Sequence, residues 1–207
     1  MSRNAYDYYP TPPEAALPLM EFIKESGVEF SAALDPAAGS GALPRWLEPL
    51  GAQWEVQELC SEWYPTLSET PGVRLVTTGD SLSELWSGIP VVANPPFGKL
   101  LVRFMHRIHD HCRKHKVFGA VLVPAPWWGE GKRAEMWQPD CLLWITGRMR
   151  FKITESQVPT THVWSIFMPE PLESTRISWA CPGAPTSDQR AMHHKMMKFD
   201  PFQLELF

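Results

Sequence analysis

The sequence predicts an α/β fold, with a mostly parallel sheet and helices on both faces. Its 207 residues are enough for one well-buried domain and too few for two comfortable ones. Up to Pro124, short apolar runs alternate with stretches of helical spacing, which is the pattern of such a fold. The composition, 44% hydrophobic and 20% charged, is globular, and no run approaches the roughly 18 apolar residues of a membrane span.

The net charge and the cysteine pattern limit which kinds of function and site the sequence can have. The net charge of -4 gives no global attraction to phosphate, so a nucleic-acid contact would need a local basic surface. The four cysteines have no CxxC spacing, so neither a zinc site nor a disulfide framework is indicated. The residues that follow Met1 lack the apolar stretch of a secretion signal. We therefore expect a cytoplasmic protein.

The elements up to Pro124 follow from local pattern. Parallel strands buried on both faces are short runs rich in apolar and β-branched residues. Such runs occupy residues 32–34, 53–57, 73–77, 89–93 and 117–123. Helices are predicted between them over 13–26, 41–50, 63–68, 81–86 and 99–116. The last of these helices carries its apolar residues on one stripe and its charges on the other.

After Pro124 the alternation changes. Three strands with only loops between them are predicted over 142–145, 148–153 and 162–168, and a hairpin that closes the sheet with an antiparallel strand fits this pattern. From about Pro182 the chain is polar and then rich in Met and Phe. We therefore expect a single domain over 1–181 and a flexible extension over 182–207.

The first motif with chemical meaning is the run from Asp35 to Gly41, Asp-Pro-Ala-Ala-Gly-Ser-Gly, between a strand and a helix. Gly39 and Gly41 let the backbone pass close to a ligand. A nucleotide-type pocket at the switch point of an α/β sheet is therefore predicted. A dinucleotide fingerprint would need a third glycine where Pro44 stands, so an NAD enzyme is disfavoured.

The second motif is Asn94-Pro95-Pro96-Phe97, directly after the fourth strand. The prolines fix the backbone so that the Asn94 side chain and the Pro95 carbonyl can point the same way. Two such acceptors suit an amino group with two hydrogens. Phe97 can stack on a flat ring.

Together these motifs resemble those of class I S-adenosylmethionine-dependent methyltransferases that act on adenine N6. Residues 8–14, Tyr-Tyr-Pro-Thr-Pro-Pro-Glu, are similar to the N-terminal cofactor segment of the DNA enzymes with the gamma motif order. The nearest resemblance, over residues 6 to 168, is to short phage-type DNA N6-adenine methyltransferases. It implies a Rossmann-like, mostly parallel seven-stranded sheet with an antiparallel terminal hairpin, and a bacterial or phage origin.

The resemblance also implies roles for individual residues. S-adenosyl-L-methionine would be held by the two motifs and by acidic residues at the ends of the second and third strands. Glu58 would accept from the ribose hydroxyls and Asp80 from the adenine amino group, although each could instead cap a helix. The implied cofactor-binding residues are Thr11, Pro12, Asp35, Ala37, Gly39, Gly41, Glu58, Asp80 and Asn94.

The implied catalytic residues are Asn94, Pro95, Pro96 and Phe97. The two acceptors favour a pyramidal amino nitrogen whose lone pair faces the sulfonium methyl, so transfer is direct and mainly a matter of positioning. A base within a duplex must first flip out. Methylation of RNA adenine, methylation of a protein glutamine, and an inactive clamp- or DNA-binding protein stay open as alternatives.

Weaker patterns give further hypotheses. The histidine-rich run 106–116 keeps helical spacing, so we interpret it as a solvated basic helix end and expect no metal. Residues that combine aromatic and basic character are candidates for nucleic-acid contact, with ordinary packing or an exposed turn as the alternatives. They are Trp127, Trp128, Lys132, Arg148 and Arg150.

The last five residues, Gln-Leu-Glu-Leu-Phe, resemble the short peptide by which bacterial DNA-processing enzymes dock on the replication sliding clamp. Gln203 and Leu204 begin it, and Leu206 and Phe207 would anchor in an apolar pocket. The partners expected from the sequence are DNA and this clamp. A tail that folds back on the domain is the alternative.

Overall fold

A computed structural model describes residues 8–129, 131–146, 149, 161–180 and 186–198. Eight strands form one sheet in the order β3-β2-β1-β4-β5-β7-β6-β8. They are β1 (Ala32–Asp35), β2 (Gln53–Glu58), β3 (Val73–Thr78), β4 (Val91–Ala93), β5 (Gly119–Pro124), β6 (Cys141–Ile145), β7 (His162–Phe167) and β8 (Arg176–Ala180). β7 pairs antiparallel with both β5 and β6, whereas the other pairs are parallel.

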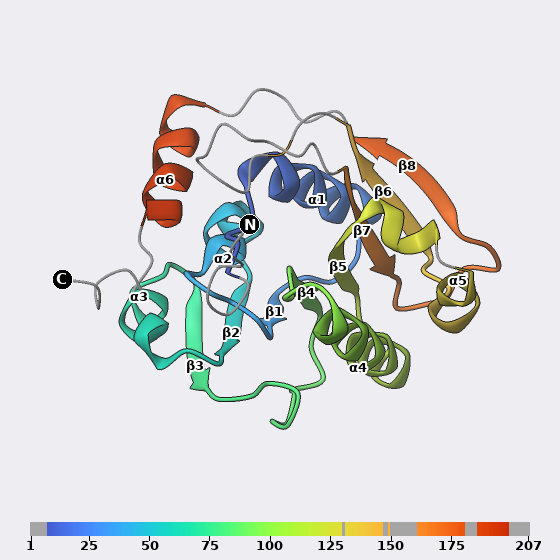
Figure 1. Cartoon of the computed structure of the whole chain (residues 1–207), viewed down its shortest axis with the longest axis horizontal. Helices are drawn as coiled ribbons and strands as arrows, with labels where there is room; N and C mark the ends of the chain where they lie inside the picture. The colour runs from blue at the N-terminus through green and yellow to red at the C-terminus, as the bar shows by residue number, and fades with distance from the viewer. Residues whose placement is uncertain (1–7, 130, 147–148, 150–160, 181–185, 199–207) are drawn as a thin grey trace.

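Helices lie on both faces of this sheet (Figure 1). The α-helices are α1 (Pro13–Ser26), α2 (Ala42–Trp46), α3 (Tyr64–Ser68), α4 (Lys99–His115), α5 (Lys132–Trp137) and α6 (Ser187–Lys198). Short 3-10 helices are η2 (Glu48–Leu50), η3 (Ser61–Trp63) and η4 (Ala125–Gly129). Among the described residues, no helix has the length and apolar character needed to cross a membrane.

The core has two parts because side chains of a strand alternate between the faces of the sheet. On β4, Val92 packs with α1 and α2, while Val91 and Ala93 pack with α4. β5 alternates in the same way, with Ala120 and Leu122 on the α1 face. Such strands are apolar on both sides, which explains their continuous apolar runs.

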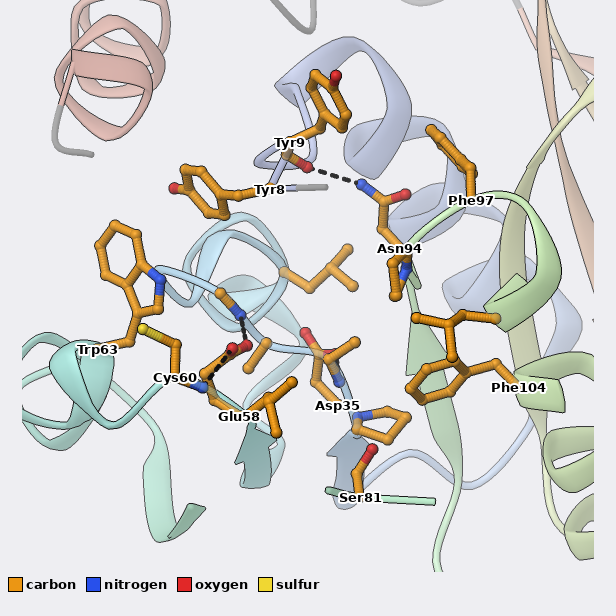
Figure 2. A pocket seen from close by; sticks show the side chains of 18 of the residues that line it. Tyr8, Tyr9, Asp35, Glu58, Cys60, Trp63, Ser81, Asn94, Phe97 and Phe104 are labelled. Carbon is orange, nitrogen blue, oxygen red and sulfur yellow. Dashed lines mark hydrogen bonds between the residues drawn. The ribbon is translucent and has the colours of Figure 1, made fainter. Parts of the chain in front are cut away.

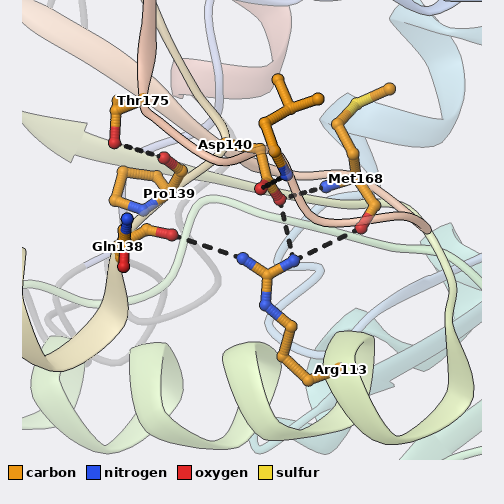
Figure 3. A network of polar contacts seen from close by, with 7 residues as sticks. Arg113, Gln138, Pro139, Asp140, Met168 and Thr175 are labelled. Carbon is orange, nitrogen blue, oxygen red and sulfur yellow. Dashed lines mark hydrogen bonds and ion pairs between the residues drawn. The ribbon is translucent and has the colours of Figure 1, made fainter.

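An ion pair ties α4 to the far end of the sheet (Figure 3). Arg113 donates to Asp140 at 2.8 Å, and the Asp140 side chain is only 2% exposed. The same carboxylate accepts from the backbone N–H groups of Met168 and Leu172, each at 2.7 Å. Asp140 therefore fixes the chain that follows β7 as well as α4.

Two expectations about the elements were wrong. Residues 81–86 form a turn, because the Asp80 side chain accepts from the N–H of Leu82 and Arg107 donates to the carbonyls of Leu82 and Glu84. Within the described residues the sheet has eight strands where seven were expected, because β8 pairs with the edge of β6. An edge strand with Ile177 and Trp179 exposed carries little pattern of burial.

The remaining expectations concern the direction of the strands, the strand over 148–153 and the C-terminal extension. The mostly parallel sheet and its antiparallel strand are confirmed. The strand expected over 148–153 lies outside the described residues, apart from the buried Met149. Helix α6 occupies part of the expected extension.

Candidate functional site

A cavity of about 740 Å³ opens where the order of the sheet reverses, between β1 and β4. This is the place where α/β sheets bind ligands, since the loops that follow neighbouring strands diverge there. The extended residues before α1 form one wall. Its lining includes Tyr8, Tyr9, Thr11, Asp35, Ala37, Gly39, Glu58, Cys60, Trp63, Asp80, Ser81, Asn94, Pro96, Phe97, Lys99 and Phe104. The two sequence motifs therefore share one cavity (Figure 2).

Asp35 ends β1 at the floor of this cavity and is only 1% exposed. Its carboxyl accepts from the N–H of Ala37 at 3.1 Å. Burial raises the pKa of Asp35 to about 8, since the one hydrogen bond offsets little of the lost hydration and nearby Glu58 adds repulsion. A cationic ligand group would favour the ionised form of this carboxyl.

Glu58 ends β2 and holds the glycine turn in place. One of its oxygens accepts from the N–H of Gly39 at 2.7 Å, and the other accepts from the N–H of Cys60 at 3.0 Å. Burial raises the pKa of Glu58, and these hydrogen bonds partly oppose that shift. Each carboxylate oxygen has a second lone pair for a ligand hydroxyl.

The glycines of the turn have different surroundings. Gly39 has a φ of +51°, and a Cβ there would lie 2.8 Å from the ring of Tyr8. Gly41 has a φ of +76° and does not line the cavity; a Cβ there would lie 3.0 Å from Thr70. Gly39 thus allows the turn to meet the N-terminal segment, and Gly41 allows it to pack on the chain after α3.

Asp80 lies after β3 and is exposed at the cavity edge. Its carboxylate accepts from the N–H of Leu82 at 3.0 Å and from the hydroxyl of Ser83 at 3.4 Å. Asp80 therefore stabilises a turn. The sequence had left open whether it caps a helix.

The second motif faces the same cavity. Asn94 and Pro96 line it together with Phe97, whereas Pro95 is buried and does not line it. The Asn94 Nδ2 donates to the backbone carbonyl of Tyr9 at 3.0 Å. An amide has one oxygen, so this bond leaves Asn94 Oδ1 as the side-chain acceptor for another group.

Hydrogen bonds to α2 and to the glycine turn hold the segment before α1 in place. The Thr11 carbonyl accepts from the indole of Trp46 at 2.9 Å, and Thr11 itself is 2% exposed. Pro12 precedes α1 and is buried outside the cavity lining. The Tyr8 hydroxyl donates to Ser40 at 2.8 Å, which joins this segment to the glycine turn.

Other candidates are not in the cavity. Trp127 is 9% exposed and stacks on Trp137 at 5.1 Å between ring centroids, so it packs in the core. This is the ordinary packing that was the alternative to nucleic-acid contact. Trp128 donates to Ser165 at 2.9 Å. Lys132 is exposed on α5. Outside the described residues lie Arg148, Arg150, Gln203, Leu204, Leu206 and Phe207.

Within the described ranges, no three His, Cys, Asp or Glu side chains gather as a metal site. His111 of the histidine-rich run is buried and its Nε2 lies 2.9 Å from the carbonyl of Ile89. His106 accepts from the indole of Trp137 at 3.2 Å.

Sequence reasoning did not single out several cavity residues. Trp63 is 2% exposed, and its ring centroid lies 4.9 Å from that of Tyr8. The Cys60 thiol donates to Glu62, and burial raises its pKa to about 11, so it is not a nucleophile at neutral pH. The wall formed by Tyr9 was missed as well. The signal available was the aromatic pair at the start of the N-terminal segment.

Comparisons with known proteins give the fold. No family model and no curated protein matches the chain. Among solved structures, a proposed RNA methyltransferase from Pyrococcus horikoshii is 20% identical, with a TM-score of 0.65 over 84% of this chain and 92% of that one. The modification subunit of a proposed type I restriction enzyme from Vibrio vulnificus is 14% identical, with a TM-score of 0.53 over 97% of this chain and 54% of that one.

A third similar structure, the 23S rRNA methyltransferase ErmE, is 12% identical, with a TM-score of 0.50 over 86% of this chain and 74% of that one. At these identities the likeness is one of fold. The chain has the Rossmann-like fold of S-adenosylmethionine-dependent methyltransferases.

Proposed function

We propose that this protein transfers a methyl group from S-adenosyl-L-methionine to the N6 amino group of adenine in DNA. One observation carries the proposal. A single cavity joins the glycine turn and its acidic neighbours to the Asn94 side chain, whose free acceptor faces away from Tyr9. A methyl donor and an amino acceptor can therefore meet inside it.

The cavity residues fit this cofactor. A volume of about 740 Å³ lies within the range of roughly 300 to 1,000 Å³ typical of small-molecule sites. The cofactor has cationic groups and ribose hydroxyls, and the cavity offers Asp35, Glu58 and Asp80 as acceptors. Trp63 and Leu59 add apolar surface for a flat ring. When bound, S-adenosylmethionine supplies an electrophilic methyl group on a sulfonium.

The residues of the second motif would orient the acceptor. Asn94 Oδ1 accepts one hydrogen of the adenine amino group, and the Pro95 carbonyl accepts the other. Phe97 stacks on the base, a contact worth about 1–3 kcal/mol. These contacts hold the nitrogen lone pair toward the methyl group, so the chain contributes positioning and electrostatics and no separate general base.

DNA is our first choice of substrate because residues 8–14 resemble the N-terminal segment of DNA enzymes. RNA is the second candidate, favoured by the likeness of fold to a proposed RNA methyltransferase and to an rRNA methyltransferase. A flipped or unpaired base would fit the cavity in either case, since a stacked base cannot reach it.

A substrate panel tests the proposal. The purified chain is incubated with isotope-labelled S-adenosylmethionine and duplex DNA, single-stranded DNA, RNA or protein, and the products are digested for mass spectrometry. We expect labelled N6-methyladenine in DNA. The label in RNA adenine alone would favour the second candidate, and a label in glutamine or in none of the samples would contradict both.

A further inference from the structure

We propose that Tyr9 and Phe97 form the two aromatic walls of a slot for the target base, with Asn94 at its floor. This inference rests on the proposed function and adds Tyr9 as a substrate-positioning residue. The two rings come from segments 88 positions apart in the sequence and lie on either side of the Asn94 amide (Figure 2).

The two rings are close to parallel and both line the cavity. Their planes differ by 20° and their centroids are 6.4 Å apart. Both side chains are partly exposed there. A flat base that enters the cavity beside Asn94 can therefore pack against both rings.

Tyr9 also fixes the orientation of the Asn94 amide at the floor of the slot. The Tyr9 carbonyl accepts from Asn94 Nδ2 at 3.0 Å, so the chain at Tyr9 fixes which end of the amide faces the base. An acceptor faces it, which suits an amino group and disfavours a carbonyl at the same position. Tyr9 would thus select adenine-type edges over keto edges.

Contacts with neighbouring residues hold the Tyr9 and Phe97 rings in place. Tyr8 contacts Ser40 and Trp63 on the cofactor side, while the next residue, Tyr9, contacts the Asn94 and Phe97 side. Phe97 also packs against His162, which is 4% exposed, with centroids 5.9 Å apart. Both rings are thus placed before a base arrives.

The slot can be tested without knowing the recognition sequence. The probe is 8-azidoadenosine, which labels nearby side chains on irradiation, in the presence of saturating S-adenosylhomocysteine to keep it out of the cofactor half. Labelled peptides are identified by mass spectrometry. We expect the label on Tyr9 and Phe97 and its loss with excess adenosine.

Variants separate a wall from a merely structural role. Tyr9→Ala should reduce labelling of Phe97 at least about fivefold, as expected from the loss of one stacking contact. Tyr9→Phe keeps the ring and the carbonyl, so it should restore the labelling. Tyr64→Ala is the matched control, since Tyr64 is 51% exposed on α3 and does not line the cavity.

The outcomes distinguish the two proposals. Label on residues other than Tyr9 and Phe97 in the wild type, or undiminished labelling of Phe97 in Tyr9→Ala, overturns the slot even if the substrate panel shows adenine methylation. Label on both rings with no methylation of any substrate leaves the slot standing and refutes the proposed function. If Tyr9→Ala does not fold, the wild-type labelling pattern and Tyr9→Phe decide.

Discussion

The side chain of Asn94 is fixed by the main chain of Tyr9, through a 3.0 Å hydrogen bond from Nδ2 to the carbonyl oxygen. The bond joins the loop after β4 to the segment before α1. That segment also contacts the glycine turn through Tyr8 and Ser40. Residues 8 and 9 therefore connect the glycine-turn side of the cavity with the Asn94 side.

Replacement of Asn94 should separate binding from chemistry. Asn94→Ala removes the side-chain acceptor, and the loss of one such positioned group costs about 10²–10³ in rate. We expect methyl transfer to fall by at least 100-fold on that basis. The affinity for S-adenosylhomocysteine, measured by calorimetry, should change little. A parallel loss of affinity would contradict the assigned role.

Cofactor affinity should depend on pH through Asp35. Its pKa is about 8 in the unliganded cavity, and a cationic ligand favours the carboxylate. Affinity for S-adenosylmethionine should therefore rise from pH 6.5 toward pH 8.5 and level off above the pKa. Calorimetry of Asp35→Asn should give a flatter profile. An equally steep profile in that variant would assign the effect to another group such as Glu58.

The same carboxyl should make the fold less stable as pH rises. The folded pKa of about 8 exceeds the ordinary value of 3.8, so the native state holds a proton that the unfolded chain releases. The contribution of Asp35 to stability is fully present below about pH 4 and is lost between about pH 4 and 8, by up to about 1.4 kcal/mol per pH unit. In urea unfolding, the free energy of unfolding of Asp35→Asn should increase relative to that of the wild type as pH rises. The absence of such an increase would contradict the raised pKa.

A methyl group at Gly39 should impair cofactor binding. Gly39→Ala places a Cβ 2.8 Å from Tyr8 at a positive φ, so the glycine turn or the tyrosine must move. Gly51→Ala is the matched control, because it has a φ of +71° and nothing within 4 Å. Both should lose about 1–2 kcal/mol of stability, but only Gly39→Ala should weaken cofactor binding, by roughly tenfold. Equal affinities would show that the contact is unimportant.

Removal of Asp140 should destabilise the fold without touching the cavity. Asp140→Ala removes the carboxylate that pairs with Arg113 and accepts from two backbone N–H groups, and breaking such a buried pair costs about 3–5 kcal/mol. Glu170→Ala breaks the pair of Lys116 and Glu170, which are 71% and 81% exposed, and should cost at most about 1 kcal/mol. Denaturant unfolding measures both. Similar small losses would mean that the Asp140 network contributes little.

The C-terminal peptide makes a separate prediction. If residues 203–207 dock on a bacterial sliding clamp, as their resemblance to a docking peptide implies, their deletion should abolish clamp binding in a pull-down and leave methylation of short oligonucleotides unchanged. Clamp binding by the truncated chain would refute the docking role.

The sequence was most informative where local signals are strong. The helix over 13–26 was predicted with its observed bounds, because Pro13 starts it and Gly27 ends it in the left-handed conformation. Asp35 and Asn94 could be assigned to one pocket because both follow strands that were recognisable as buried parallel strands, and the fold brings the ends of such strands together.

Contacts between distant residues could not be predicted in the same way. The sequence left open whether Trp127 contacts nucleic acid or packs in the core, and the structure shows it buried and stacked on Trp137, ten positions on. The turn over 81–86 depends on Arg107 of α4, and the role of Tyr9 depends on a hydrogen bond across 85 positions. Such pairings follow only from the packed structure.

The claim that one cavity presents a methyl donor to the Asn94 acceptor is tested most directly by a crystal structure with S-adenosylmethionine. We predict the ligand in the cavity over Asp35 and Glu58, with its sulfonium methyl directed toward Asn94 Oδ1. A ligand bound elsewhere, or one whose methyl group is walled off from Asn94, would contradict the account.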